Sequence, residues 1–583
     1  MMKTVAIGLQ SFEDIRTRNI FYVDKTNFIR EWWESEDAVT LITRPRRFGK
    51  TLNMSMMECF FSNRYADRGD LFEGLSIWED EKYRKLQGTY PVIFISFAPI
   101  KTGNAESMKI VVKQIISNIY DRFRDIMKSE QFSDSDRAFF DSVNMNMPDE
   151  ILYTSINQLC IYLEKYYGKK AVVLLDEYDT PMQEAWLAGN WDDAAAFFRS
   201  FFNATFKTNP NLQRAIITGI TRISRESIFS DLNNLKIVTV SSETYAECFG
   251  FTESEVFDAM DEYGLSDQKQ VVKQWYDGFT FGRHTDIYNP WSIINYLDER
   301  KLGCYWVNTS SNGLVNQLMR KGDAETKMVV EDLIRGKSFS AKLDEQIVFS
   351  QLDGNNEAVW SLLLASGYLK IMNIEVIDTE ADWTYLYTLS CTNKETRIMF
   401  SRMVSGWFNT GDRSYNYFIK ALLANDVESM NEFMNNVALR VFSCFDSGNG
   451  YSKSEPERFY HGFVLGLMVD LSERYVLTSN RESGFGRYDV MLCPVDRERD
   501  NAESGFGRYD IMLEPKNKED NAYIIEFKVH KPAKEKTLED TVAAALAQIK
   551  EKKYDTLLID KGVPVDKIYK YGFAFEGKCV QIG

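Results

Sequence analysis

The feature that most constrains this chain is a Gly-Lys-Thr tripeptide that stands between an apolar run and a helical pattern. Residues 39–43 (VTLIT) are typical of a short buried strand, and residues 52–61 (LNMSMMECFF) have the composition of an apolar helix. The segment that joins them, 44–51, reads RPRRFGKT. A strand, a tight loop and a helix around Gly-Lys-Thr form a P-loop, in which backbone N–H groups hold phosphate oxygens. The sequence therefore predicts a nucleotide phosphate site here.

The residues of this loop have separate predicted roles. We expect Lys50 to reach the β- and γ-phosphates of ATP, and Thr51 to place its hydroxyl on Mg²⁺. The full set expected to contact the nucleotide in this loop is Arg47, Phe48, Gly49, Lys50 and Thr51. The first glycine of the pattern G-x-x-x-x-G-K-[ST] is absent, and Arg44 stands in its place. The competing interpretation is a surface turn that contains Gly-Lys-Thr by chance.

A second apolar run ends in two acids. Residues 171–180 (AVVLLDEYDT) carry five apolar residues before Asp176 and Glu177. Such a run suits a parallel strand buried on both faces, and acids at its C-terminal end lie where open α/β sheets bind ligands. We expect Asp176 to hold Mg²⁺ through water and Glu177 to polarise the water that attacks ATP. Alone, a core strand followed by solvated acids is the commoner explanation, and the Gly-Lys-Thr loop is what favours hydrolysis.

A third run, 215–221 (AIITGIT), brings polar residues to the same edge of the predicted sheet. The run ends in Thr218, Thr221 and Arg222, and a polar residue here is expected to sense the γ-phosphate. Thr218 and Arg222 are counted with Asp176 among the residues expected to contact the nucleotide. Arg222 or Arg225 is a candidate arginine finger, acting within the chain or on a neighbouring subunit. A surface salt bridge is the more common role for either arginine.

The spacing of strands and helices predicts the fold class of the N-terminal part. The expected strands are 39–43, 91–97, 171–176, 215–220 and 236–241, with helices at 105–128 and 192–207 between them. This alternation predicts an α/β fold, a P-loop ATPase core over 1–250 whose parallel sheet has helices on both faces. The acidic pair after the third strand favours the additional-strand, catalytic-glutamate branch of these ATPases.

The middle of the chain has a different pattern. Residues 251–300 begin with Thr252 and Glu255, spaced as a helix capping box, and their Gly- and aromatic-rich joints predict a small helical lid. Residues 301–446 predict a helical, winged-helix-like region in which a strand is followed by a helix capped by Asn393. A winged helix can bind DNA, but a packing module between domains explains the pattern equally well. A polar linker then leads to a C-terminal domain at 457–583.

The C-terminal domain contains a second group of charged residues. Asp510 lies in one expected strand, and Glu526 and Lys528 lie in the next, where alternation puts both on one face. Two carboxylates that bind Mg²⁺ and a lysine that positions or deprotonates water are typical of phosphodiester hydrolysis. Support is expected from flanking helices, with Glu457 as a further metal ligand, and with Gln548 and Tyr554 beside the site. The predicted catalytic residues of the whole chain are Glu177, Asp510, Glu526 and Lys528, and the predicted metal ligands are Thr51, Asp176, Asp510, Glu526 and Glu457.

An internal repeat complicates this second centre. ESGFGRYDVML at 482–492 recurs as ESGFGRYDIML at 503–513, so Asp489 and Asp510 have nearly identical neighbours. One copy can pair beside Glu526, and the other is then extruded as an extra hairpin. The short connection to the next strand favours Asp510.

The amino-acid composition excludes several other classes of protein. The formal net charge of −16 argues against a general nucleic-acid coat and leaves only local basic patches. The eight cysteines form no C-x-x-C pair, which disfavours a zinc site and indicates reduced thiols in a cytoplasmic protein. No apolar run approaches the roughly 18 residues of a membrane span, so no membrane partner is expected.

Together these motifs resemble a known fusion. RPRRFGKTLNMS, LLDEYDTP, WYDGFTFG and YNPWS look like the predicted AAA-ATPase-like family of Bacteroidales type, in which RPRRFGKT is usual. FYHGFVLGLMV, ESGFGRYDIMLEP, IIEFKV and AQIKEKKY look like the PD-(D/E)XK nuclease superfamily domain, a restriction-endonuclease-like α/β fold. The duplicated strand departs from that pattern. The resemblance implies ATP and Mg²⁺ as cofactors and an ATPase coupled to a nuclease acting on DNA. The alternative is a nucleotide-dependent switch that binds nucleic acid or a protein without cleaving. A homo-oligomer is left open.

Overall fold

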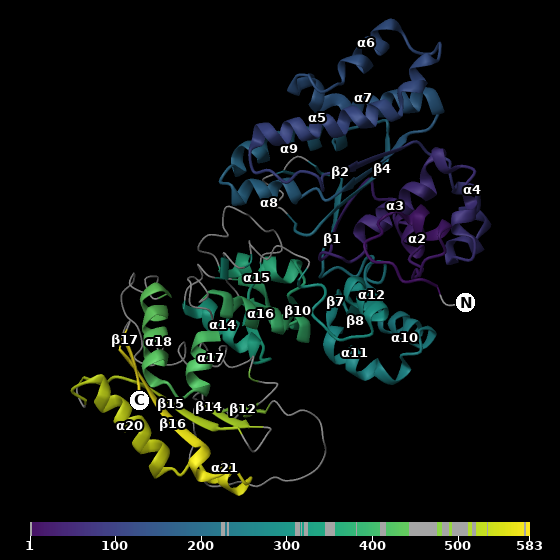
Figure 1. The fold of residues 1–583 in the computed structure, drawn as a ribbon. Coiled ribbons are helices and arrows are strands. Elements are labelled where there is room, and N and C mark those ends of the chain that lie inside the picture. Colours follow the sequence, from purple (N-terminus) through teal and green to yellow (C-terminus); the bar gives the residue numbers. More distant parts are fainter. Residues whose placement is uncertain are drawn as a thin grey trace. The chain divides into compact units, whose positions relative to one another are not determined.

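The computed structural model shows the fold of this chain over most of its length (Figure 1). The residues that it describes are 3–222, 228–229, 232–308, 315, 318–319, 324–343, 356–379, 382–407, 416–441, 464, 471, 475–480, 489–491, 511–515, 520–532, 535–576 and 579–583. They form two compact units, one made of 1–318 with 338–396 and the other of 319–337 with 397–583. The middle region expected at 301–446 is thus divided between the units.

The first unit is built on a five-stranded sheet in which the paired strands are parallel. Its strands are β1 (Val39–Thr43), β2 (Val92–Ser96), β3 (Ala171–Asp176), β4 (Leu212–Gly219) and β5 (Leu235–Val238). The strand order is β2-β3-β4-β1-β5, so β4 separates the P-loop strand β1 from the acidic strand β3. The α/β fold with a parallel sheet that the sequence predicts for this region is therefore confirmed.

Helices cover both faces of this sheet, as Figure 1 shows for α5, α7 and α9 on one side and α2 and α3 on the other. The helices of this region are α1 (Phe12–Thr17), α2 (Asn27–Glu34), α3 (Lys50–Phe61), α4 (Glu81–Leu86), α5 (Ala105–Arg122), α6 (Asp134–Ser142), α7 (Asp149–Tyr167), α8 (Thr180–Leu187) and α9 (Trp191–Phe206). All six residues of β3 are buried, and Val172 and Leu174 share a core with Met54 and Phe60 of α3. Burial on both faces explains why the sequence of β3 is a continuous apolar run.

The segment expected to be a helical lid contains strands as well as helices. Its elements are β6 (Phe251–Thr252), α10 (Glu253–Glu262), α11 (Lys269–Tyr276), β7 (Phe279–Phe281), β8 (His284–Tyr288) and α12 (Pro290–Glu299), with strand order β6-β8-β7. The capping box of Thr252 and Glu255 is present at the start of α10. Gly278 has a φ of 130°, and a Cβ there would lie 2.0 Å from the carbonyl oxygen of Thr392. A close backbone approach therefore requires this glycine.

The middle region combines a long antiparallel hairpin with helices. In the first unit it contains β9 (Phe339–Ala341), α15 (Asn356–Ala365), β10 (Leu369–Thr379) and β11 (Asp382–Cys391), in the order β10-β11-β9. Helix α16 (Lys394–Trp407) follows, and Asn393 caps it by accepting a hydrogen bond from the N–H of Thr396 at 3.0 Å. The helices α14 (Ala324–Ile334), α17 (Asn416–Leu423) and α18 (Val427–Val441) belong to the second unit.

The second unit contains a six-stranded mixed sheet. Its strands are β12 (Tyr475–Asn480), β13 (Asp489–Met491), β14 (Ile511–Pro515), β15 (Ala522–Val529), β16 (Ile568–Glu576) and β17 (Cys579–Ile582), in the order β13-β12-β14-β15-β16-β17. Helix α20 (Leu538–Glu551) packs on β15 and β16, and α21 (Thr556–Asp560) follows it. Asn431 and Asn435, one turn apart on α18, hydrogen-bond the backbone of Ile582 and Val580, which closes the outer edge of β17.

Across the described ranges, we find no helix with both the length and the apolar character that crossing a membrane requires.

Candidate nucleotide and nuclease sites

The loop between β1 and α3 has the backbone of a tight phosphate loop. Arg47 and Gly49 both have positive φ, 66° and 78°, which turns the chain sharply into the N-terminus of α3. The Nζ of Lys50 donates to the carbonyl oxygens of Arg44 and Pro45 at 2.9 and 2.8 Å. Burial lowers the pKa of Lys50 to about 8, although three nearby carboxylates oppose this effect. A buried ammonium at a helix N-terminus is suited to an anionic ligand.

Asp176 is the centre of the contacts at the carboxyl edge of the sheet. Thr51 Oγ1 donates to Asp176 Oδ2 at 2.8 Å, and Thr218 Oγ1 donates to Asp176 Oδ1 at 2.6 Å. Asp176 is 1% exposed, and burial raises its pKa while the two hydroxyl groups lower it. Hydroxyl and carboxylate oxygens are the hard donors that Mg²⁺ prefers, so this group fits that ion. The structure thus brings Asp176 together with Thr51, which lies 125 positions away in the sequence, and with Thr218, which lies 42 positions away.

Glu177 occupies the turn directly after β3. Its φ is 54°, a left-handed conformation that is uncommon for a non-glycine residue. Its Oε2 accepts a hydrogen bond from Thr180 Oγ1 at 3.1 Å, and the side chain is partly exposed. Backbone strain of this kind clusters at functional sites, where the surrounding structure maintains it.

Arg44, which replaces the first glycine of the usual pattern, is fully buried. Its guanidinium donates to the carbonyl oxygens of Thr43, Thr239 and Thr244 at 3.0, 2.6 and 3.2 Å, and it lies 4.5 Å from the ring centre of Phe281. These contacts fasten the start of the phosphate loop to the segment after β5. The arginine therefore has a structural role here that a glycine cannot fill.

The phosphate loop also contacts the module made of residues 278–291. The Phe48 ring centre lies 4.7 Å from that of Phe279, and the Arg47 guanidinium lies 4.3 Å from the ring centre of Trp291. Asn289 Nδ2 donates to the carbonyl oxygen of Arg46 at 3.2 Å. Part of the segment expected to form a lid thus packs against this loop, and its action as a lid stays a prediction. The side chains of Arg47 and Phe48 are directed to the module, and their contact with a nucleotide stays a prediction.

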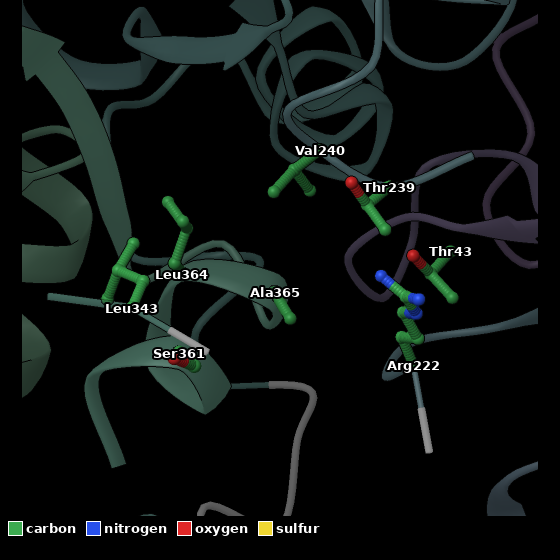
Figure 2. Close-up of a pocket in the computed structure, with 8 residues that line it drawn as sticks. All are labelled: Thr43, Arg222, Thr239, Val240, Leu343, Ser361, Leu364 and Ala365. Atoms are coloured by element: carbon green, nitrogen blue, oxygen red, sulfur yellow. The ribbon is translucent and has the colours of Figure 1, made fainter. Parts of the chain in front are cut away.

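Arg222 lies at the wall of a small cavity (Figure 2). The cavity has a volume of about 30 Å³ and is lined by Thr43, Arg222, Thr239, Val240, Leu343, Ser361, Leu364 and Ala365. Figure 2 shows Arg222 beside Thr43, with Leu343, Ser361, Leu364 and Ala365 on the opposite wall. This volume holds about two water molecules. The finger role of Arg222 stays a prediction, and Arg225 lies outside the described residues.

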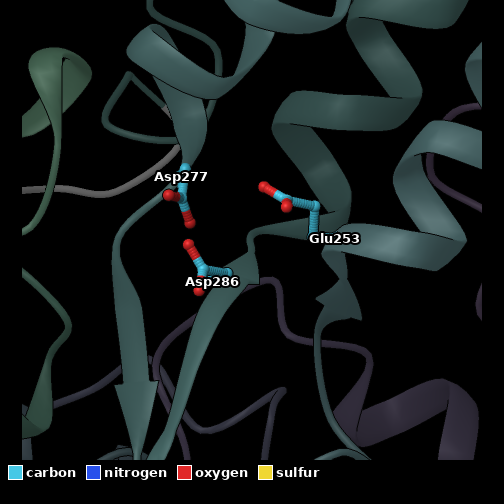
Figure 3. Close-up of side chains that lie close together, drawn as sticks. All are labelled: Glu253, Asp277 and Asp286. Carbon is cyan, nitrogen blue, oxygen red and sulfur yellow. The ribbon is translucent and has the colours of Figure 1, made fainter.

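A cluster of acids that the sequence did not indicate lies in the 251–300 segment. Glu253, Asp277 and Asp286 bring carboxylate oxygens within 4.8 Å of one another (Figure 3). Burial raises the pKa of Asp277 to about 6. The ammonium of Lys273 pairs with Glu253 and with Asp286, the latter at 3.2 Å. The cluster is therefore an ion-pair network that joins α10, α11 and β8.

The second centre lies between β15 and α20. Glu526 is 4% exposed and accepts a hydrogen bond from Gln548 Nε2. Lys528 Nζ donates to Gln548 Oε1 at 2.6 Å, and Gln548 Nε2 also donates to the hydroxyl of Tyr554 at 3.2 Å. Gln548 thus bridges the acid and the lysine that alternation puts on one face of β15. Gln548 and Tyr554 thus lie beside this pair as expected, and their support of a nuclease site stays a prediction.

The two copies of the repeat belong to different strands. The second copy ends in β14, where Ile511 pairs with Ile525 of β15. The first copy ends in β13, which begins at Asp489 and pairs with β12 at the outer edge of the sheet. Residues 489–491 of the first copy therefore form an edge strand, which β12 and β14 separate from β15. Asp510 and Glu457 lie outside the described residues.

The topology and the contacts at Asp176 define a P-loop ATPase-like region, joined in the same chain to a mixed-sheet domain. Protein-family comparison agrees, since the family described as Predicted AAA-ATPase matches residues 6–229 and the PD-(D/E)XK nuclease superfamily matches residues 499–583. The chain therefore contains a predicted AAA-ATPase domain and a C-terminal PD-(D/E)XK nuclease superfamily domain. A protein of Azotobacter chroococcum mcd 1, described as an uncharacterized protein in the vnfD 5′ region, is 25% identical over 391 residues, which cover 66% of this chain and 67% of that protein.

Proposed function

We propose that this protein binds and hydrolyses ATP, and that the nucleotide state controls a metal-dependent nuclease in the C-terminal domain that acts on DNA. The observation that carries the proposal is the pair of hydroxyl contacts from Thr51 and Thr218 to Asp176. Those contacts join the first turn of α3 to the ends of β3 and β4, the three segments that must cooperate around a nucleotide in the additional-strand branch.

In the ATPase, each residue acts on a separate atom. Lys50 leaves its loop carbonyls and donates to the β- and γ-phosphates, which replaces neutral acceptors by anionic ones. Thr51 and Asp176 would hold Mg²⁺, which neutralises phosphate charge when it is bound. Glu177 accepts a hydrogen bond from the attacking water and orients it toward the γ-phosphate, while Thr218 registers the state of that phosphate.

In the nuclease, Glu526 and Asp510 would hold a divalent ion, which stabilises negative charge developing on the phosphodiester. The carboxylate of Glu526 is a hard donor suited to Mg²⁺. Lys528 positions the attacking water, and Gln548 fixes the distance between the lysine and the acid. We assign the second metal ligand to Asp510 because β14, which directly follows it, pairs with the strand of Glu526.

The test is a cleavage assay on linear and circular DNA with Mg²⁺ or Mn²⁺, with and without ATP. We expect cleavage that needs the metal and whose rate changes when ATP is added. A Glu526→Gln variant, which keeps the shape of the side chain, is expected to bind DNA without cutting it. Metal-independent cleavage, or cleavage that Glu526→Gln retains, would contradict the nuclease assignment.

The second candidate is a nucleotide-dependent switch whose C-terminal domain binds nucleic acid or a protein partner without cleaving it. The added edge strand β13 is the observation that favours it, because it enlarges the sheet beside β12. This candidate predicts ATP-dependent DNA binding by the unmutated protein and no cleavage with either metal.

A further inference from the structure

Asp179 is a buried acid that the proposed mechanism does not use. It is 1% exposed and stands at the N-cap position of α8, where an aspartate normally accepts a hydrogen bond from its own helix. No such capping bond is present at the described start of α8. The carboxylate is instead directed across the sheet edge, to the turn that follows β4.

One oxygen of Asp179 accepts hydrogen bonds from four donors. The backbone N–H groups of Ile220 and Thr221 donate to Oδ2 at 3.0 and 2.9 Å, and Thr221 Oγ1 donates to it at 2.8 Å. Gln183 Nε2 is the fourth donor, at 3.0 Å. The neighbouring residue Tyr178 adds a bond from its hydroxyl to the carbonyl oxygen of Thr221 at 2.7 Å. The turn after β4 is thus held on both sides by the two residues that follow Glu177.

Gln183 extends this contact to the phosphate loop. Its Oε1 accepts a hydrogen bond from Arg46 at 3.3 Å, while its Nε2 donates to Asp179. Arg46 belongs to the loop that precedes Lys50. A continuous chain of hydrogen bonds therefore runs from the phosphate loop, through Gln183 and Asp179, to the turn that carries Thr221 and Arg222.

Gly219 shows that this arrangement is closely packed. A Cβ at this position would lie 2.5 Å from the ring of Tyr178 and 2.8 Å from Asp179 Oδ1. Only a glycine permits the acid and the tyrosine to reach the turn. Oδ1 itself has no hydrogen-bond partner among the described residues, so the four bonds to Oδ2 are what hold this carboxylate in place.

We propose that Asp179 is a positioning residue that fixes the turn after β4 next to Asp176 and Glu177. Through Gln183, it also holds that turn at a fixed position relative to the phosphate loop. This inference rests on the ATPase function proposed above. Thr218 contacts Asp176 from the strand that leads into the same turn. Asp179 therefore controls where Thr218 and Arg222 lie relative to the γ-phosphate, without touching the nucleotide.

The experiment compares Asp179→Asn with the full-length wild type. The amide keeps the shape but loses the charge that strengthens four hydrogen bonds. We expect kcat for ATP hydrolysis to fall on the order of ten- to a hundredfold, because small misplacements at a reacting centre are costly. The KM for ATP should change less than about threefold, since ground-state binding rests on Lys50 and the loop. Asp192→Asn is the matched control, because Asp192 is an exposed acid in the first turn of α9.

A second variant tests the link to the phosphate loop. Gln183→Met keeps the length of the side chain and removes the bonds to Arg46 and Asp179, and its effect on kcat should be smaller, about threefold to tenfold. The double variant Gln183→Met/Arg46→Met should lower kcat by no more than the larger of the two single effects. The reason is that both substitutions remove the same connection between the phosphate loop and Asp179. Fully multiplicative effects would overturn the link.

Amide hydrogen exchange tests the position of the turn after β4 without relying on ATP hydrolysis. In Asp179→Asn, and not in Asp192→Asn, we expect faster exchange of a peptide containing residues 218–222 at unchanged global stability. If Asp179→Asn leaves both the exchange of this peptide and kcat unchanged, the proposal is overturned. It is also overturned if kcat falls only in proportion to a loss of folded protein. If the wild type binds no ATP, the ATPase proposal fails, and the exchange result alone decides whether Asp179 holds the turn.

Discussion

The candidate nucleotide centre collects its residues from the C-terminal ends of three neighbouring parallel strands and the segments that follow them, whereas the described residues of the candidate nuclease centre come from one strand and one helix. In the first unit, the register pairs Thr43 with Gly219 and Leu175 with Ile217, which brings the carboxyl ends of β1, β3 and β4 to one edge. Long insertions between these strands leave that edge intact. In the second unit, the site depends on which strand lies beside β15, so one duplication is enough to change its composition.

The comparison teaches where each centre is vulnerable. The nucleotide centre is protected by strands buried on both faces and by Arg44, which fastens the loop to the chain after β5. In the candidate nuclease centre, Gln548 bridges Glu526 and Lys528 from the neighbouring helix α20. Substitutions at either end of this bridge are therefore expected to have large effects on the activity assigned to the C-terminal domain.

The first prediction concerns the bridge on β15. Lys528→Met and Glu526→Gln should each lower metal-dependent DNA cleavage by more than about a hundredfold, because the water or the ion loses its partner. Gel assays of linear DNA under single-turnover conditions measure this. ATP hydrolysis, which is assigned to the other unit, is expected to stay within about twofold and serves as the internal control. Equal loss of both activities would mean that the variants have unfolded.

The second prediction uses the repeat as a matched pair. Asp510→Ala should lower cleavage by more than about tenfold, because losing one carboxylate weakens a metal site. Asp489→Ala should leave most of the activity, because β13 lies at the edge of the sheet and away from β15. The opposite order of the two variants would assign the site to the first copy.

The third prediction returns to the nucleotide centre. Thr218→Val should lower kcat for ATP hydrolysis about tenfold, since it removes a hydrogen bond to a buried carboxylate while keeping the volume of the side chain. Thr218→Ser retains the hydroxyl and should recover most of the rate. Steady-state phosphate release reports both values. Wild-type activity in Thr218→Val would remove this residue from the proposed site.

The smallest effect expected is a pH dependence of ATP binding. Burial lowers the pKa of Lys50 to about 8, so free protein loses this proton as the pH rises above that value, whereas phosphates keep it on the bound lysine. Binding then takes up a proton, and affinity falls with rising pH, on the order of eightfold between pH 7.5 and pH 9. Titrating a non-hydrolysable ATP analogue across this range measures the slope. Affinity that rises with pH would contradict the role given to Lys50.

Sequence patterns were sufficient to predict the parallel sheet and the meeting of Thr51 with Asp176, because strand ends in such a sheet coincide whatever lies between them. They could not predict the role of Arg44, whose carbonyl partners at Thr239 and Thr244 lie about 200 residues along the chain and share no motif with it. The cluster at Asp277 was missed because no motif marks Glu253, Asp277 and Asp286, although they lie in one short segment. Between Asp489 and Asp510, local sequence is nearly identical, and only strand pairing distinguishes the copies.

The strands of the 251–300 segment are another feature that the sequence did not predict. The Gly- and aromatic-rich joints, expected to form a helical lid, contact the loop at 44–51, where Phe48 packs on Phe279 and Phe281. Their extended backbone was not predicted, because β6, β7 and β8 are two to five residues long and too short for a period of two to be recognised.

The most direct test of the nucleotide centre is the thermal stability of three proteins with and without ATP and Mg²⁺. Wild type and Glu177→Gln should both unfold at a higher temperature when ATP is added, and only the wild type should release phosphate. Lys50→Ala should show no stabilisation, because its phosphate cation is gone. Equal stabilisation of wild type and Lys50→Ala by ATP would contradict the assignment of residues 44–51 as the phosphate loop.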